Sequence, residues 1–185
     1  IVAKIEAIYG HAYNVDSEIT VTAGATQALT TAIFCCVHPG DEVIVIEPVY
    51  DSYVPAITLA GGVPVAVEME VGPNGYTVPW HKVAAAVTSK TRLIIINTPH
   101  NPTSTVLRAA DMQALADIVR GTDVLILSDE VYEHMVYDGH RHESVSRYPE
   151  LAARAFVVSS FGKTYHVTGW KVGYVAAPAP LMAEF

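Results

Sequence analysis

Positive charge is scarce in this sequence: 11 lysines and arginines stand against 19 aspartates and glutamates, which gives a formal net charge of −8 at pH 7. Nucleic acids and anionic membrane surfaces attract basic proteins, so a chain this acidic is poorly suited to either. Long apolar runs are also missing, because no stretch reaches the roughly 18 residues that a membrane-spanning helix needs. We therefore expect neither nucleic acid nor a membrane as a partner.

Cysteine is nearly absent. The two that are present, Cys35 and Cys36, are neighbours inside an apolar stretch. A disulfide between adjacent residues would be strained, so the pair indicates buried thiols in a reducing compartment. The sequence begins without the charged and apolar regions of a signal peptide. These features predict a cytoplasmic protein.

The two ends of the sequence have incomplete helix patterns. Ile1, Ile5 and Ile8 lie on one face of a helix that has no capping residue before it, and a second helix begins at the prolines near 178–180 without a C-cap. A length of 185 residues with 51% hydrophobic content suits one compact domain. We expect residues 1–185 to form one domain of a longer protein, truncated at both ends.

Apolar runs of strand length recur along the chain and are mostly continuous, which is typical of strands covered on both faces. Helical patterns separate several of them. The strand runs are at 19–23, 42–48, 63–69, 92–97, 124–129, 155–160 and 171–177, and the helical patterns are at 25–37, 51–60, 79–87 and 108–120. This alternation predicts an α/β fold, a three-layer α/β/α sandwich with a mostly parallel seven-stranded sheet. Residues 71–78 are predicted to be a turn cluster and 137–144 a polar loop.

Polar residues follow the ends of several predicted strands. The segments are Gly24-Ala25-Thr26, "NTPHNPT" from 97, "SDEVYEH" from 128 and "SFGKTYH" from 160. In open α/β sheets ligands bind at the carboxyl ends of the strands, so these segments predict an active site. The "GKT" at 162–164 resembles part of a nucleotide phosphate loop, but that motif needs glycine at 157, where this chain has valine. No GxGxxG occurs either, so neither nucleotide-binding motif is present.

The same segments match another cofactor. Pyridoxal phosphate (PLP) needs an amine, a carboxylate for its ring nitrogen, donors for its phenolic oxygen and anchors for its phosphate. "AGAT", "EPVYDSY", "NTPHNPT", "SDEVYEH" and "SSFGKTYHVTGWKVGY" resemble the fold-type I, class I/II aminotransferases, and most of all the branch of methionine and kynurenine aminotransferases. The resemblance covers essentially all 185 residues, in the family's order. It implies the large, PLP-binding domain of such an enzyme.

The resemblance assigns the two central residues. Lys163 is implied to be the Schiff-base lysine, and a lysine at a strand end near a cationic ring is suited to act as a nucleophile and proton carrier. Asp129 is implied to pair with the ring nitrogen of the cofactor. A carboxylate at the end of an apolar strand needs a partner, although Asp129 could instead cap a helix starting at "EVYEHM".

The remaining contacts also follow from the resemblance. Tyr132 and Asn101 match the donors to the phenolic oxygen, while Asn97 fits a turn role equally well. Tyr50 matches the aromatic that stacks on the ring, with Tyr53 as the competing candidate. The phosphate is expected at the start of the helix that opens at 25, where free N–H groups favour anions. Its implied contacts are Ala25, Thr26, Ser160 and Lys171.

Some nearby residues are not assigned to the site. The spacing of His140 and His142 suits a metal, but acidic ligands around them are few and the segment reads as an exposed loop, so we expect no metal site. We expect packing roles for His100 and His166. Ser104 stands where the family commonly has glycine, which we interpret as a subfamily difference.

The family implies an amino acid and a 2-oxo acid as substrates and a homodimer as the assembly. Its relatives bind the substrate carboxylate with an arginine in a C-terminal small domain and borrow a tyrosine from the partner subunit, and neither has a counterpart in residues 1–185. Methionine, aromatic amino acids and glutamine are the family's typical substrates. Two other functions stay open: another PLP enzyme on this scaffold, such as a carbon–sulfur lyase or decarboxylase, and an aminotransferase-like ligand-sensing domain of a regulator.

Overall fold

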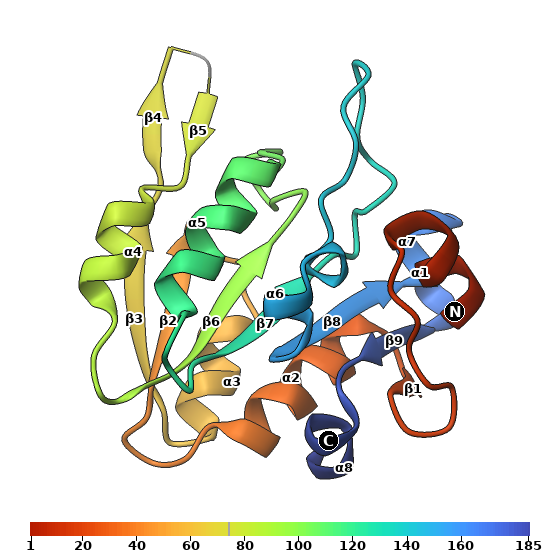
Figure 1. Ribbon diagram of the computed structural model, residues 1–185, viewed down its shortest axis with the longest axis horizontal. Helices are drawn as coiled ribbons and strands as arrows, with labels where there is room; N and C mark the ends of the chain where they lie inside the picture. The colour runs from red at the N-terminus through yellow and green to blue at the C-terminus, as the bar shows by residue number, and fades with distance from the viewer. Residues whose placement is uncertain (74) are drawn as a thin grey trace.

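The computed structural model describes residues 1–73 and 75–185, and it contains a seven-stranded sheet with helices on both faces (Figure 1). The strand order is β1-β9-β8-β7-β6-β2-β3. β9 is antiparallel to both of its neighbours, β1 and β8, and the other pairings in this sheet are parallel. The expected α/β fold with a mostly parallel sheet is confirmed.

The strands of the sheet lie close to the predicted ranges. They are β1 (Ile19–Thr22), β2 (Glu42–Glu47), β3 (Val63–Glu68), β6 (Thr91–Asn97), β7 (Leu125–Asp129), β8 (Ala155–Ser160) and β9 (Gly173–Ala176). A short hairpin of β4 (Glu70–Gly72) and β5 (Gly75–Thr77) occupies the region predicted as a turn cluster and projects from the body of the molecule (Figure 1). Asn74, which belongs to that predicted cluster, lies outside the described residues.

Two apolar cores form because successive residues of each strand point to opposite faces of the sheet. On β6, Ile94 and Ile96 pack in one core, and Leu93 and Ile95 pack in the other. The first core lies under α1 (Val2–Tyr9), α4 (Trp80–Ala86), α5 (Ala109–Val119), the 3-10 helix η1 (Val145–Arg147) and α6 (Pro149–Ala152). The second lies under α2 (Ala25–Cys36), α3 (Tyr53–Leu59) and α8 (Ala179–Glu184). Three layers result, as expected.

The chain from 130 to 144 differs from the prediction in two ways. No helix follows β7: residues 131–134 form a turn, because the N–H of Glu130 donates to Val158 O (2.8 Å) and the N–H of Val131 to the Asp129 side chain (3.2 Å). Tyr132 is therefore carried by a turn and not by a helical face. The predicted exposed loop at 137–144 is partly wrong as well, since His142 is only 6% exposed and pairs with Glu130.

The last part of the sheet brings distant segments together. α7 (Phe161–Thr164) and the 3-10 helix η2 (Thr168–Trp170) connect β8 to β9. Figure 1 shows α1, near the N-terminus, beside α7 and β9, and Lys4 Nζ donates to the hydroxyl of Tyr174 on β9 (3.0 Å). The longest helix that the structure describes, α2, has 12 residues, and none of the described helices could cross a bilayer.

Candidate active site

A cavity of about 470 Å³ lies where β6, β7 and β8 end and α2 begins. Its walls carry apolar groups such as Leu29 and Val131 together with a group of polar side chains. All nine residues that the sequence assigned to the site line this one cavity: Ala25, Thr26, Tyr50, Asn101, Asp129, Tyr132, Ser160, Lys163 and Lys171. Segments spread over almost 150 positions of the sequence are thereby brought together.

Asp129 is the most deeply buried polar group of the cavity, with 4% of its surface exposed. Its Oδ2 accepts a hydrogen bond from the hydroxyl of Tyr53 on α3 (2.7 Å), and its Oδ1 accepts from the N–H of Val131 (3.2 Å). Burial raises the pKa of Asp129 to about 6, and these two hydrogen bonds oppose the rise. In the part of the chain that the structure describes, Asp129 has no ion-pair partner.

The helix start at the cavity is open to an anion. Gly24 caps α2 with φ 83°, a value that favours glycine, and no side chain caps the helix. The first N–H groups of a helix have no partner within it, so those of Ala25 and Thr26 remain available. Lys171 lies beside them, 3.7 Å from the position that a Cβ on Gly24 would take. The ammonium group and the helix start can therefore act on the same anion.

The position of Lys163 depends on the end of β8. Ser160 caps α7 by accepting a hydrogen bond from the N–H of Gly162 (3.0 Å), which fixes the turn that carries Lys163. The Lys163 ammonium lies 5.6 Å from the centre of the Tyr132 ring, so the amine and the phenol face the same space.

Two asparagines complete the polar wall. Asn97 donates from Nδ2 to the backbone oxygen of Asp129 (2.9 Å) and accepts at Oδ1 from the N–H of Asn101 (2.7 Å). Asn97 thus fixes the Asn101 segment and lines the cavity itself, so the turn role and the site location are compatible. Tyr50 lies on the same wall, with its ring edge-on to that of Tyr53 at 5.7 Å.

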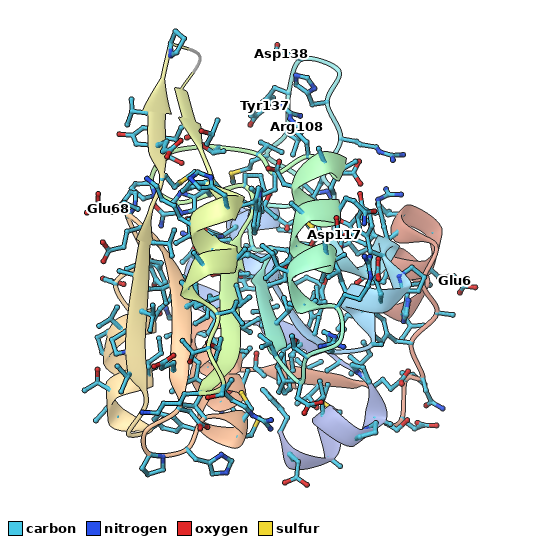
Figure 2. All side chains as sticks on the ribbon, turned by 60° about the vertical axis from the view of Figure 1, so that its left-hand side comes forward. Glu6, Glu68, Arg108, Asp117, Tyr137 and Asp138 are labelled. Carbon is cyan, nitrogen blue, oxygen red and sulfur yellow. The ribbon has the colours of Figure 1, made fainter. Side chains whose placement is uncertain are left out.

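A second cavity of about 430 Å³ adjoins the first, and Asn101 and Tyr132 line both. Its other lining residues come from the 99–108 segment and the loop from 135 to 140. Figure 2 shows Arg108, Tyr137 and Asp138 near one another at the same end of the molecule as the hairpin β4–β5, and all three line this second cavity.

Other candidates have different roles. His100 is 7% exposed and its Nδ1 lies 2.9 Å from the hydroxyl of Thr103, which confirms a packing role, whereas His166 is exposed and its predicted packing role is wrong. Residues 1–73 and 75–185 contain no group of three histidine, cysteine or acidic side chains placed to hold a metal ion. Sequence reasoning did not find the hydrogen bond from Tyr53 to Asp129, since nothing in "YDSY" indicates which tyrosine reaches a residue 76 positions away.

Several known proteins are similar to this chain over its whole length. It is 52% identical over 184 residues to the methionine aminotransferase of Escherichia coli, and 38% identical to kynurenine–oxoglutarate transaminase 3 of Mus musculus. These alignments cover 100% and 98% of this chain but 47% and 43% of the relatives. The chain therefore spans about half the length of the curated relatives it matches.

The structural comparison agrees. The crystal structure of the methionine aminotransferase YbdL from Escherichia coli superposes with a TM-score of 0.95 at 51% identity, covering 99% of this chain and 48% of that one. The N-succinyldiaminopimelate aminotransferase from Mycobacterium tuberculosis gives a TM-score of 0.96 at 39% identity, with the same two coverages. The family description "Aminotransferase class I and II" matches residues 1–184. Sequence and fold agree, and the chain belongs to the class I and II aminotransferases.

Proposed function

We propose that this chain is the cofactor-binding part of a PLP-dependent aminotransferase, which exchanges the amino group of an amino acid with a 2-oxo acid. The observation that carries the proposal is the buried carboxylate of Asp129, which has no ion-pair partner among the described residues and lies in the same cavity as Lys163 and the open start of α2. A buried carboxylate is costly without a cation, and the protonated pyridine nitrogen of PLP is a cation of suitable size. When bound, PLP supplies an electron sink for the charge that develops on Cα of the amino acid.

The residues of the cavity fit the other groups of this cofactor. Lys163 provides the amine for its aldehyde, and Tyr132 and Asn101 provide donors for its phenolic oxygen. Tyr50 covers one face of the ring. The helix start at Ala25 and Thr26, together with Ser160 and Lys171, provides donors and positive charge for the phosphate.

Three side chains would then carry out the chemistry. Asp129 holds the proton on the ring nitrogen, which keeps the ring electron-poor. With PLP bound, the Lys163 amine would move a proton between Cα of the substrate and the C4′ carbon of the cofactor. Tyr132 orients the Lys163 amine, since its ring lies 5.6 Å from Nζ.

Borohydride reduction tests this assignment, because it fixes an imine between lysine and PLP as a stable adduct. We expect mass spectrometry of the reduced protein to find the adduct on Lys163, and Lys163→Ala to abolish it. Lys90→Ala, at an exposed lysine far from the cavity, is the control and should retain it. A trapped lysine adduct that persists in Lys163→Ala would contradict the proposal.

The substrate is proposed from the relatives. Methionine is the first candidate and aromatic amino acids the next, because the matched relatives include methionine and kynurenine aminotransferases. Release of a 2-oxo acid with transfer of the amino group supports a transaminase, whereas release of ammonia and a thiol would indicate a carbon–sulfur lyase. Cofactor binding without turnover of any amino acid would indicate a ligand-sensing domain.

We further propose that residues 1–185 form the large domain of a longer, homodimeric protein whose small domain holds the substrate carboxylate. Orientation of the substrate accounts for roughly 7–11 kcal/mol of catalysis in well-aligned systems. Residues 1–185 alone should therefore convert methionine at a negligible rate compared with the longer protein, in an assay of oxo-acid formation. Comparable rates per site would show that the chain holds the substrate by itself.

A further inference from the structure

The carboxylate of Glu133 is a buried junction between three elements on the α1 side of the sheet. Only 4% of the residue is exposed. From α1, the ammonium of Lys4 lies 2.5 Å from Oε2 and the hydroxyl of Tyr9 donates to the same oxygen. From β8, the hydroxyl of Ser159 donates to Oε1 (2.5 Å), and from β9 the hydroxyl of Tyr174 donates to the same oxygen (3.5 Å). Both carboxylate oxygens are therefore engaged, and by elements that are far apart in the sequence.

The charge of this junction is balanced. Burial by itself would raise the pKa of Glu133, but the Lys4 charge and the hydrogen bonds from Lys4, Ser159 and Tyr9 outweigh it, so the pKa is lowered overall. Glu133 is thus ionised at neutral pH, and its contacts are charge-assisted, which makes them stronger than hydrogen bonds between neutral groups.

Glu133 and Ser159 are each next to a residue of the proposed active site in the sequence. Glu133 follows Tyr132 in the turn after β7, and Ser159 precedes Ser160, which caps the helix carrying Lys163. Successive residues of β8 alternate between the two faces of the sheet. Val157 and Ser159 lie on the face of the first core, where Ser159 reaches Glu133, and Val158 and Ser160 lie on the opposite face, where Ser160 lines the cavity. One carboxylate therefore ties the Tyr132 turn to the strand end that positions Lys163.

Tyr132 needs such an anchor. Among the residues that the structure describes, no hydrogen bond fixes its hydroxyl, and its ring contacts the Lys163 ammonium at 5.6 Å. The backbone sets the position of Tyr132. On one side Asp129 holds this backbone by accepting a hydrogen bond from the N–H of Val131 (3.2 Å), and on the other side Glu133 holds it by accepting one from the Ser159 hydroxyl. Glu133 itself does not line the cavity.

We propose that Glu133 is a positioning residue, whose carboxylate sets the position of the Tyr132 phenol relative to the Lys163 amine. This inference rests on the proposed function. A correctly placed Tyr132 donates to the phenolic oxygen of PLP and favours its deprotonated form, so a displaced Tyr132 should raise the pH at which the bound cofactor changes colour. Loss of the Ser159 contact should also weaken cofactor binding.

The experiment compares variants of the whole protein by titrating the absorbance of bound PLP with pH and by measuring the Kd for PLP. Glu133→Gln keeps the size of the side chain and removes its charge, and Ser159→Ala removes only the link to β8. Met112→Ala, in the core under α5, is the control for a general loss of stability. We expect Glu133→Gln to raise the pH midpoint by about one unit and Kd by roughly tenfold, and Ser159→Ala to produce a smaller change in the same direction.

The outcomes separate the two proposals. If Glu133→Gln proves too unstable, Tyr9→Phe removes one donor to the same carboxylate and should give a smaller rise of the midpoint. The positioning role is overturned if the wild-type protein binds PLP but the Glu133, Ser159 and Tyr9 variants have the same pH midpoint and Kd as wild type or as Met112→Ala. The proposed function stands in that case. If the wild-type protein forms no absorbing complex with PLP, the proposed function is overturned and this inference with it.

Discussion

The hydroxyl of Tyr53 donates a hydrogen bond of 2.7 Å to Asp129, and both residues are buried between α3 and the end of β7. Tyr53 was a candidate for stacking on the cofactor ring, and the structure instead gives it a contact to the carboxylate. A hydrogen bond to a carboxylate favours its ionised form, so Tyr53 opposes the effect of burial on Asp129.

Asp129→Asn should stabilise the cofactor-free protein above pH 6. Burial raises the pKa of Asp129 from 3.8 to about 6, so the folded state binds its proton more tightly than the unfolded state. Ionisation of Asp129 in the folded state therefore lowers the free energy of unfolding as pH rises from about 4 to 6. The full loss, at most about 3 kcal/mol, persists above that range. Denaturant unfolding at pH 4 and pH 8 measures the difference in unfolding free energy between Asp129→Asn and wild type. This difference should be present at pH 8 and vanish at pH 4.

The same variant should lose most of its activity. Without the carboxylate, the ring nitrogen of PLP has no group to hold its proton, and we expect transamination to fall by roughly 10²-fold or more. Asp123→Asn, at an exposed carboxylate, should leave both stability and rate unchanged. A near-normal rate in Asp129→Asn would remove Asp129 from the mechanism.

Tyr53→Phe should have the opposite effect on stability. Loss of the hydroxyl leaves the Asp129 carboxylate buried with fewer donors, so the pKa of Asp129 should rise further and unfolding at pH 8 should become easier by about 1–3 kcal/mol. At pH 4, where Asp129 is protonated, the loss should be smaller. Tyr137→Phe, with a side chain that is 72% exposed, is the matched control. Equal losses at both pH values would show that only packing was disturbed.

Gly173→Ala should weaken cofactor binding by moving β9 away from α2. A Cβ at Gly173 would lie 2.6 Å from the backbone N of Ala25 and the backbone C of Gly24, which is closer than real contacts allow. The backbone must shift at the expected phosphate site, so we predict an increase of roughly tenfold in the Kd for PLP and a loss of about 1–3 kcal/mol in stability. Gly169→Ala meets nothing within 4 Å and should leave both unchanged.

Lys4→Met should destabilise the fold because it leaves the Glu133 carboxylate buried without its cation. Breaking a buried pair in this way costs about 3–5 kcal/mol. The pKa of Glu133 lies below its usual value, so the stabilisation is present above about pH 4.5 and is lost as pH falls through the folded-state pKa. Thermal unfolding at pH 7 and pH 3 should therefore show a large difference from wild type only at pH 7.

The control for that variant is Lys82→Met. Lys82 pairs with Glu70 at 2.9 Å, but both side chains are about half exposed, so water screens the pair and the melting temperature should hardly change. If Lys4→Met behaves like Lys82→Met, the Glu133 junction contributes little to the fold.

The sequence predicted the sheet well, because strands follow from local patterns: continuous apolar runs located them. The family resemblance supplied the nine assigned site residues, and all nine line one cavity. The roles of those nine residues remain predictions. The sequence could not predict pairings between side chains that are distant along the chain. Examples are Tyr53 with Asp129, and Lys4 with Glu133, the latter two being 129 positions apart. The burial of His142 was missed for the same reason, since its partner Glu130 lies on a different segment.

The backbone at Ser104 has an uncommon conformation. The family resemblance implies that glycine is common at this position, and the φ of Ser104, 61°, lies in the left-handed region that glycine adopts without strain. The conformation therefore suits glycine although the residue here is serine. The sequence indicated the substitution but not the conformation.

The antiparallel pairing of β1 with β9 has a consequence for how the protein is made. Among the described strands β1 pairs with β9 alone, and its partner residues 173–176 come about 150 positions later. During synthesis the start of α2 therefore emerges long before Lys171 and Gly173, which lie beside it in the finished fold. Contacts of such high sequence separation close a large loop and form slowly. We expect the end of the cavity formed by the start of α2 and Lys171, which we propose binds the phosphate, to be among the last parts of the chain to fold. A nascent chain should then acquire affinity for phosphate groups only after β9 has left the ribosome.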